Sequence, residues 1–349
     1  MFHSLSYRLP VELIAHVVQY VDARDDLVRI LLVDKFCFHT SSRIIYHTID
    51  QLSPSKSISL LKSLCANHSY PPLVQVLDLD WTPCDLTAAA VRLLNRALRR
   101  LTNLTSLVVD NCYLTTQIFN GCTFSLEKLT TTIAIDASLS DFLITQPNIQ
   151  ELCLRNFRKC ETKFALPPSA LPRLSHFRAL HASSTFLAHT VKGRPVENVS
   201  LAMLTEQAND CLSALTLSAL PVKRMSIMFF DSPVPRELMP EITKRLPELE
   251  ALQIVVLTAQ FNMVRYVSIA YSWSLMCIVQ SILKDMAPLL SDFKHLRVIT
   301  FVAMGTHPLT SDEQSIASLW HESCPTLKTI ILPNGIVWFQ KDGEWASGA

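Results

Sequence analysis

The stretch LTSLVVDNC, residues 104–112, contains a six-residue pattern that recurs along most of the chain. In this pattern an aliphatic residue is followed by two variable residues, a second aliphatic residue, one variable residue and a third aliphatic residue. The ten copies, several of them imperfect, are VQVLDL (74–79), LTSLVV (104–109), LEKLTT (126–131), IQELCL (149–154), LSHFRA (174–179), VENVSL (196–201), VKRMSI (222–227), LEALQI (249–254), LRVITF (296–301) and LKTIIL (327–332). Their starts are separated by 30, 22, 23, 25, 22, 26, 27, 47 and 31 residues.

Periods of this length, with a short strand and a helical segment in each unit, are typical of leucine-rich solenoids. A single unit cannot bury its own apolar face, so stability comes from contacts between neighbouring units. The segment 87–101 supplies an amphipathic helix, and only LTSLVVDNC completes the full L-x-x-L-x-L-x-x-N/C repeat, with Cys112 at the turn. The predicted fold class is α/β, a degenerate leucine-rich-repeat solenoid with a horseshoe form and a parallel sheet on its concave face. A mixed α/β domain without solenoid order is the alternative.

The N-terminal segment LPVELIAHVVQYV, residues 9–21, has the features of a short helix. Pro10 suits the first turn, because a residue there has no intrahelical partner for its N–H. An apolar stripe follows at helical spacing: Leu13, Ile14, Val17, Val18 and Val21. Asp25 and Asp26 indicate a second helix, and a third is predicted from about Lys35 to Tyr46. Three short helices bury only about 60% of their chain surface, so some of these side chains must face another surface.

This segment resembles an F-box, which begins with Leu-Pro-x-Glu and ends with an aliphatic–aromatic pair. The resemblance covers about Leu5 to Asp50 and is carried by residues 9–21 together with Leu27, Leu31, Val33, Lys35, Phe36 and the closing IIYHTI. It implies a three-helix domain that docks on the Skp-type linker protein of a cullin–RING ubiquitin ligase. The positions matching the family's docking surface are Leu9, Pro10, Leu13, Ile14, Val17, Val33 and Phe36. The sequence departs from the family at Phe36, where Trp is common, and at Val11, where an acidic or polar residue is usual. The alternative is that these residues pack on the downstream part of the chain.

The predicted domain organisation has four parts: an F-box at 1–50, a linker helix and loop at 51–72, the solenoid at 73–335, and a C-terminal cap or tail at 336–349. The ending NGIVWFQKDGEW, residues 334–345, resembles a final strand or hairpin that caps a solenoid.

The 47-residue spacing is anomalous, and it contains VRYVSIAYSWSLMCIVQ, residues 264–280. The stretch from Tyr266 to Leu283 carries no charge over 18 residues, close to the length of a membrane span. Its four serines, two tyrosines and one glutamine argue against a span. A buried helical insertion is one alternative. A translated intron is the other, because codons for this segment can hold splice signals and its removal restores a spacing of 30.

The bulk composition limits the classes of function. Apolar residues make up 49% of the 349 residues and charged residues 17%, which predicts a large buried core. A net charge of +1 gives no electrostatic reason to expect nucleic acid or a membrane as a partner, and we expect neither. The first ten residues lack an apolar signal core, and the ten cysteines form no C-x-x-C pair. We therefore expect an intracellular chain, cytoplasmic or nuclear.

The motifs of common enzymes are missing from the sequence. None of the six glycines forms G-x-G-x-x-G, a P-loop or G-x-S-x-G, and no H-E-x-x-H is present. We expect no enzymatic activity, no cofactor and no metal, although an enzyme with an unrecognised site remains an alternative.

The polar residues between the buried aliphatic positions are predicted to face the concave sheet surface. The candidate target contacts are Asp78, Asp80, Asp110, Glu151, Arg155, His176, Arg178 and Arg224. Ordinary solvated surface is the alternative. With the F-box resemblance, this implies a substrate-recognition subunit of a Skp–cullin–F-box ubiquitin ligase that binds an unknown protein target and raises its effective concentration at the ligase. A leucine-rich interaction scaffold not linked to ubiquitin is the runner-up.

Overall fold

The computed structural model describes residues 10–50, 52–82, 84–156, 164–180, 183–203, 205–229, 235–257, 281–304, 313–341 and 344–348. The chain divides into two compact units, Met1–Ile133 and Ala134–Ala349. Both units are mixed α/β. The segment 264–280, with the hypotheses of an insertion or a translated intron, lies outside the described residues. The predicted domain boundaries stay predictions.

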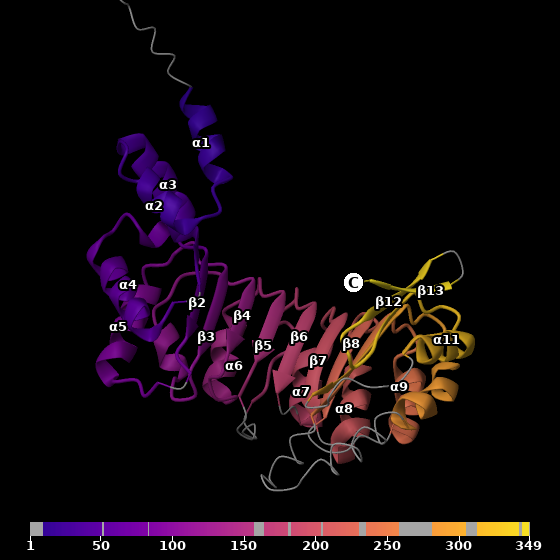
Figure 1. Cartoon of the computed structure of the whole chain (residues 1–349). Helices are drawn as coiled ribbons and strands as arrows, with labels where there is room; N and C mark the ends of the chain where they lie inside the picture. Colours follow the sequence, from indigo (N-terminus) through magenta and orange to yellow (C-terminus); the bar gives the residue numbers. More distant parts are fainter. Residues whose placement is uncertain are drawn as a thin grey trace, which may run out of the picture. The chain divides into compact units, whose positions relative to one another are not determined.

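The first unit begins with three helices, α1 (Val11–Gln19), α2 (Arg24–Ile30) and α3 (Lys35–His47). Both α1 and α2 contact α3 (Figure 1). A small core between them contains Val18, Leu27 and Cys37. The predicted helix starts are confirmed: the carbonyl of Pro10 accepts from the N–H groups of Leu13 and Ile14 at 3.0 and 3.2 Å. That these helices form an F-box remains a prediction.

The rest of the first unit alternates parallel strands with helices. Its elements are β1 (Thr48–Ile49), α4 (Pro54–Ala66), η1 (Pro71–Leu73), β2 (Val76–Asp80), α5 (Ala88–Leu98), β3 (Ser106–Asp110), η2 (Thr116–Phe119) and β4 (Lys128–Thr131). The four strands pair in chain order, all in parallel. Helices α4 and α5 lie on one face of β2 and β3 (Figure 1).

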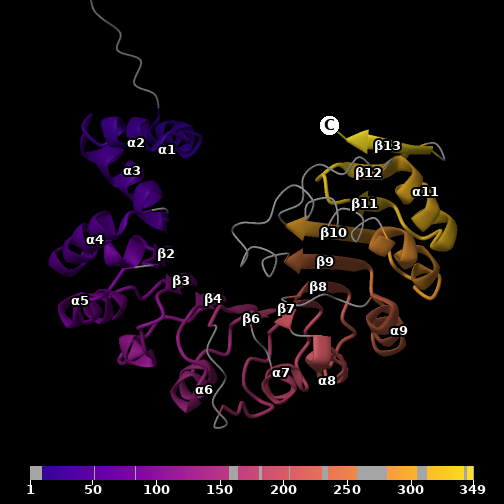
Figure 2. The same cartoon turned by 60° about the horizontal axis from the view of Figure 1, so that its bottom comes forward.

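The second unit continues the alternation. Its elements are α6 (Ala137–Ile144), β5 (Glu151–Leu154), β6 (His176–Leu180), α7 (Ser184–Val191), β7 (Asn198–Met203), η3 (Thr205–Gln207), α8 (Ala208–Leu215), β8 (Arg224–Phe229), α9 (Pro235–Arg245), β9 (Ala251–Leu257), η5 (Ala287–Leu290), β10 (Val298–Met304), α11 (Glu313–Ser323), β11 (Thr329–Ile331), β12 (Val337–Lys341) and β13 (Glu344–Gly348). Strands β5 to β11 pair in parallel, in chain order. Helices α7, α8, α9 and α11 lie along one face of these strands (Figure 2).

Every copy of the six-residue pattern contributes a strand, and its three aliphatic positions face the core. In all ten copies these positions are at most 3% exposed. The middle position of one copy lies opposite the middle position of the next. The paired residues are Leu77, Leu107 and Leu129 in the first unit, and Leu152, Phe177, Val199, Met225, Leu252, Ile299 and Ile330 in the second. This register is compatible with a solenoid.

A shared backbone carbonyl joins successive copies of the pattern. The carbonyl of Gln75, the second residue of its copy, accepts from the N–H groups of Thr105 and Ser106 at 2.9 and 3.0 Å. The second residue of seven later copies uses its carbonyl in the same way: Thr105, Gln150, Ser175, Glu197, Lys223, Glu250 and Arg297. The same pair of backbone hydrogen bonds therefore connects these repeats, whatever side chains they carry.

The turn after β3 depends on Asn111 rather than on Cys112. The side chain of Cys112 is exposed, whereas that of Asn111 is 2% exposed. The Asn111 amide nitrogen donates to the carbonyls of Trp81 and Cys84 at 3.1 and 2.9 Å, and its oxygen accepts from the N–H of Tyr113 at 3.0 Å. This side chain thus joins one repeat to the turn of the preceding repeat. The sequence pattern placed Cys112 in the role of the turn residue, and the structure gives that role to Asn111, one residue earlier.

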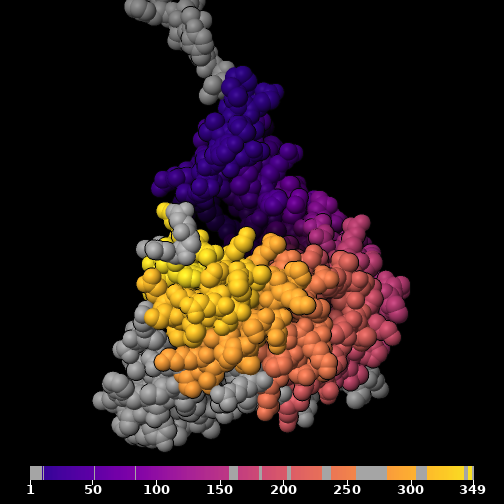
Figure 3. Space-filling model, turned by 90° about the vertical axis from the view of Figure 1, so that its right-hand side faces the viewer, coloured from indigo at the N-terminus to yellow at the C-terminus, as the bar shows by residue number. Residues whose placement is uncertain are grey.

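The predicted C-terminal hairpin is confirmed. Strands β12 and β13 are antiparallel, and β12 pairs with the edge of β11. The indole of Trp345 is buried, and its backbone carbonyl accepts from the amide of Gln314 on α11 at 3.5 Å. Figure 3 shows the yellow hairpin directly against the orange surface of the elements before it. The hairpin thereby covers a strand edge that would otherwise present unpaired backbone groups.

An arginine is fully buried in the second unit. Arg194 is 1% exposed, and its guanidinium donates to four main-chain carbonyls at 2.7–2.9 Å: those of Pro167, Ala170, His189 and Thr190. Burial lowers the pKa of this group from its ordinary value. The two carbonyls nearer the N-terminus belong to the turn that leads to Leu171, the one non-glycine residue with a positive φ (54°) among the described residues. The arginine therefore holds this turn and the end of α7 together.

We expect Arg194→Met to lower the free energy of unfolding by about 3 kcal/mol, because several buried carbonyls lose their donor at once. Urea unfolding followed by circular dichroism measures the change. Arg173→Met is the matched control, since Arg173 is exposed in the same repeat and should cost less than about 0.5 kcal/mol. Equal losses in the two variants would contradict the role given to Arg194.

A second pair of variants tests the corrected turn position. Asn111→Ala should lower the free energy of unfolding by about 2 kcal/mol, because two carbonyls and one N–H lose their side-chain partner. Cys112→Ala should change it by less than about 0.5 kcal/mol, since that side chain is exposed. Thermal and urea unfolding of the full chain give both values. A larger loss of unfolding free energy for Cys112→Ala than for Asn111→Ala would show that Cys112 is the turn residue after all.

Candidate functional site

Exposed apolar side chains are concentrated in the three N-terminal helices. Of the fourteen large apolar side chains found exposed in the described part of the chain, seven belong to residues 10–50. We call these seven the N-terminal apolar set: Leu13, Val17, Tyr20, Val28, Leu32, Val33 and Phe38. Single exposed aliphatic residues are normal on a protein surface, but a local excess of this kind marks a candidate binding surface.

Helix α1 shows why the excess arises. Successive residues of an α-helix are rotated by about 100°, so its apolar residues form two rows. The row facing α3 is buried or half-buried: Ile14, Val18 and Val21. The other row is exposed: Leu13, Val17 and Tyr20. The apolar stripe is therefore wider than the contact with α3 requires, and half of it remains in solvent.

The turn between α2 and α3 adds two further aliphatic side chains. Leu32 is 83% exposed and Val33 is 70% exposed, although both are held by backbone hydrogen bonds of 3.1 Å to the last turn of α2. Asp34 then caps α3, because its carboxylate accepts from the N–H of Cys37 at 2.7 Å, which lowers the pKa of Asp34. These apolar side chains thus project from an ordered turn.

The structure describes six of the seven docking residues predicted by the F-box resemblance. Four of them are exposed: Pro10, Leu13, Val17 and Val33. Ile14 and Phe36 are half-buried, and Leu9 lies outside the described residues. Tyr20 and Leu32 are exposed members of the set that the sequence analysis missed. Their signal was present, because Tyr20 continues the row of Leu13 and Val17, and Leu32 precedes Val33.

The second candidate surface is the face of the strands opposite the helices. In the first unit it carries Asp78, which is half-buried, and Asp80, which is exposed. Asp110 was expected to face solvent, but its side chain is only 7% exposed. The reason is that the chain turns directly after it. The N–H of Trp81 and the hydroxyl of Thr82 both donate to the Asp110 carbonyl, at 3.0 and 3.3 Å, and draw this strand end against the preceding turn.

In the second unit the strand register brings several predicted residues into one row. Glu151, His176 and Arg224 occupy equivalent positions on β5, β6 and β8, with Asn198 of β7 between the last two. Arg178 lies two residues further along β6. The side chains of His176, Arg178 and Arg224 are exposed. Glu151 and Arg155 are half-buried.

Metal binding and thiol chemistry can be considered for the described residues. Among them, no group of three or more His, Cys, Asp or Glu side chains is arranged to hold a metal ion. Burial raises the pKa of the Cys122 and Cys211 thiols to about 11, so both stay protonated at neutral pH and are poor nucleophiles. Within the part of the chain that was searched, no helix has the length and apolar character to cross a bilayer.

Comparisons with known proteins give little guidance. No protein-family model matches the sequence, and no curated protein matches it. Among the solved structures that match is a chain in the crystal structure of the Rad7 and Elc1 complex in yeast, with 14% sequence identity and a TM-score of 0.31. The match covers 78% of this chain and 90% of that chain. At this TM-score the likeness does not establish a shared fold, so the proposals below rest on the residues of this chain.

Truncations in α1 test which row supports the helix. Leu13→Ala and Val17→Ala should each change the free energy of unfolding by less than about 0.5 kcal/mol, because these side chains contact mainly solvent. Val18→Ala should cost about 2 kcal/mol, because it leaves a cavity against α3. Urea unfolding of the full chain measures all three. A large loss for the first two variants would mean that the exposed row is covered in solution.

Proposed function

We propose that this chain is the substrate-recognition subunit of a Skp–cullin–F-box ubiquitin ligase. The observation that carries the proposal is the exposure of Pro10, Leu13, Val17 and Val33, four of the positions that match the docking surface of an F-box. Under this proposal the three N-terminal helices join the linker protein, and the rest of the chain holds the target.

The energetics favour a partner on these helices. Full burial of one large aliphatic side chain contributes about 1.5–3 kcal/mol. Leu13, Val17 and Val33 together therefore offer several kcal/mol to a partner with a matching groove. A few well-packed side chains of this kind commonly dominate the affinity of a protein interface. The ordered helix and turn that carry them reduce the entropy lost on binding.

We assign the repeats to a degenerate leucine-rich solenoid whose helix-free strand face binds a protein target. The pattern supports this assignment, with three copies in register in the first unit and seven in the second. The chain would act without an active site of its own. By holding the target on the ligase, it would raise the target's effective concentration at the ubiquitin-loaded enzyme.

A leucine-rich interaction scaffold that is not linked to ubiquitin is the second candidate. It is favoured by the half-buried side chains of Ile14 and Phe36, two of the predicted docking positions that have less area to offer a linker protein. In this case the N-terminal apolar set would contact a different protein.

Binding of the full chain to a recombinant Skp-type linker protein separates these candidates. Leu13→Asp combined with Val17→Asp should weaken binding by at least about 30-fold, because each substitution places a carboxylate in an apolar interface. Isothermal titration calorimetry measures the affinity, and circular dichroism checks that the helices remain folded.

The matched control is Leu217→Asp combined with Leu220→Asp, since both residues are exposed leucines in the second unit. These substitutions should leave linker binding unchanged. Failure of the unaltered chain to bind the linker would reject the ligase subunit and favour the scaffold.

A further inference from the structure

The helix-free face of the second unit carries two rows of side chains that are polar on β6, β7 and β8. The first row runs across β6 to β10: His176, Asn198, Arg224, Ala251 and Val298. The second row lies two residues further along each strand: Arg178, Ser200, Ser226, Gln253 and Thr300. We call the six positions of β6, β7 and β8 in these rows the basic patch: His176, Arg178, Asn198, Ser200, Arg224 and Ser226.

Positive charge outnumbers negative charge at the outward positions of β5 to β10. None of the outward positions of β6 to β10 is Asp or Glu, and neither Arg178 nor Arg224 forms an ion pair with another described residue. Glu151 on β5 ends this stretch, next to His176. Two exposed guanidinium groups are therefore available to an anionic partner.

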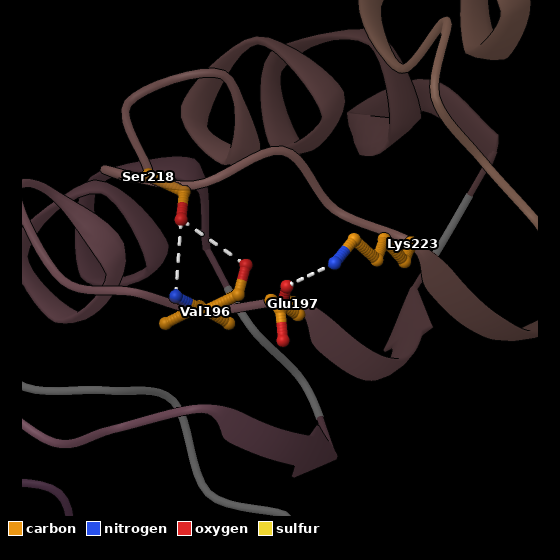
Figure 4. A network of polar contacts seen from close by, with 4 residues as sticks. All are labelled: Val196, Glu197, Ser218 and Lys223. Atoms are coloured by element: carbon orange, nitrogen blue, oxygen red, sulfur yellow. Dashed lines mark hydrogen bonds and ion pairs between the residues drawn. The ribbon is translucent and has the colours of Figure 1, made fainter.

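Lys223, next to Arg224 in the sequence, differs from it in having an acidic partner. Lys223 precedes Arg224, and its ammonium group lies 2.5 Å from a carboxylate oxygen of Glu197 (Figure 4). In the same view the hydroxyl of Ser218 bonds to the backbone of Val196, with both distances 3.1 Å. Lys223 and Ser218 thus have partners within the chain. Arg224, the residue after Lys223, is exposed and has no ion-pair partner among the described residues.

The uncharged side chains of the patch are suited to donate hydrogen bonds. The hydroxyl of Ser226 donates to the side-chain oxygen of Gln253 at 3.0 Å, which leaves the Gln253 amide nitrogen free to donate outward. Asn198 and Ser200 lie on β7, between the two arginine strands. Ionised carboxylates only accept hydrogen bonds, so they match a face rich in donors.

The spacing of the arginines defines the shape of the partner. Arg178 and Arg224 are two strands apart, about 10 Å, and are offset by two residues along the strand, about 7 Å, which gives a diagonal of about 12 Å. An extended peptide advances about 3.3 Å per residue and its side chains alternate between two faces, so acidic side chains four residues apart lie on one face, about 13 Å apart, and would span that diagonal. A guanidinium can bind each carboxylate with two parallel hydrogen bonds.

We propose that the basic patch binds an extended acidic peptide segment, with one aspartate or glutamate on Arg178 and another, about four residues away, on Arg224. A third row, two residues beyond the second, is apolar and adjoins the patch: Leu180, Ala202, Met228, Val255 and Val302. In this row Leu180, Met228 and Val302 are half-buried and offer limited contact to apolar side chains of the same peptide, whereas Ala202 and Val255 are buried. The inference deepens the proposed function and rests on it for the conclusion that the peptide belongs to a ligase target.

Fluorescence anisotropy with the full chain tests the patch directly. The probe is a labelled, otherwise neutral peptide with two glutamates at the spacing above, and its matched control has glutamine at both positions. The glutamate peptide should bind, and the glutamine peptide should bind at least about tenfold more weakly, because it loses two charge-assisted contacts. Raising the salt concentration should weaken binding of the glutamate peptide.

Variants of the chain locate the contact. Arg178→Ala and Arg224→Ala should each weaken binding of the glutamate peptide by about tenfold. Arg173→Ala, which removes an exposed arginine just before β6, should leave it unchanged. Melting temperatures should be the same for all three variants. Equal weakening by Arg173→Ala, or equal binding of the glutamine peptide, would overturn the proposal. So would binding of a phosphoserine peptide when the glutamate peptide does not bind.

The two proposals can fail separately. Leu13→Asp combined with Val17→Asp should abolish linker binding and leave binding of the glutamate peptide unchanged. Arg178→Ala combined with Arg224→Ala should have the opposite effect. A chain that binds the glutamate peptide but no linker protein supports the patch and rejects the ligase, whereas a chain that binds only the linker rejects the patch alone.

Discussion

One backbone carbonyl in eight of the ten copies of the pattern sets the alignment on which the rest of the structure depends. The carbonyl of Gln75 accepts from both Thr105 and Ser106, and the same arrangement follows each later connected copy of the pattern. This double acceptance fixes which residues of neighbouring strands lie opposite each other. A slip of one residue would turn the aliphatic positions towards solvent, because side chains alternate between the two faces of a strand. The register therefore converts a loose sequence pattern into a continuous core.

Because the backbone fixes the register, the pattern positions tolerate substitutions. Thr131 stands where an aliphatic residue is expected, yet it is fully buried, and its hydroxyl accepts from the N–H of Ile133 at 3.1 Å. Ala179 fills another such position and is also fully buried. The outward positions are freer still and can carry charge. Asp78 and Asp80 of β2 are acidic examples, and Arg178 and Arg224 of β6 and β8 are basic ones.

The sequence was sufficient to predict the features that repeat or have a local signature. The ten strands, the three N-terminal helices and the hairpin of β12 and β13 follow from periodicity, caps and turn residues. Features that depend on distant backbone were missed. Arg194 looks like a surface residue in the sequence, because its acceptors at Pro167 and Ala170 are more than twenty residues away. The choice between Asn111 and Cys112 was equally hidden, since it depends on the carbonyls of the preceding turn.

The N-terminal helices expose more of their apolar side chains than the repeats do. A chain with 49% apolar residues could expose aliphatic side chains simply because it has many. In the repeats every pattern position is at most 3% exposed, and the seven exposed large apolar side chains described after residue 50 are spread over about 230 positions of the chain. The three helices instead bury little beyond Val18, Leu27 and Cys37, and leave Leu13 and Val17 in solvent. Exposed large apolar side chains are thus denser in these helices than elsewhere in the described chain, which is the pattern of a candidate binding surface.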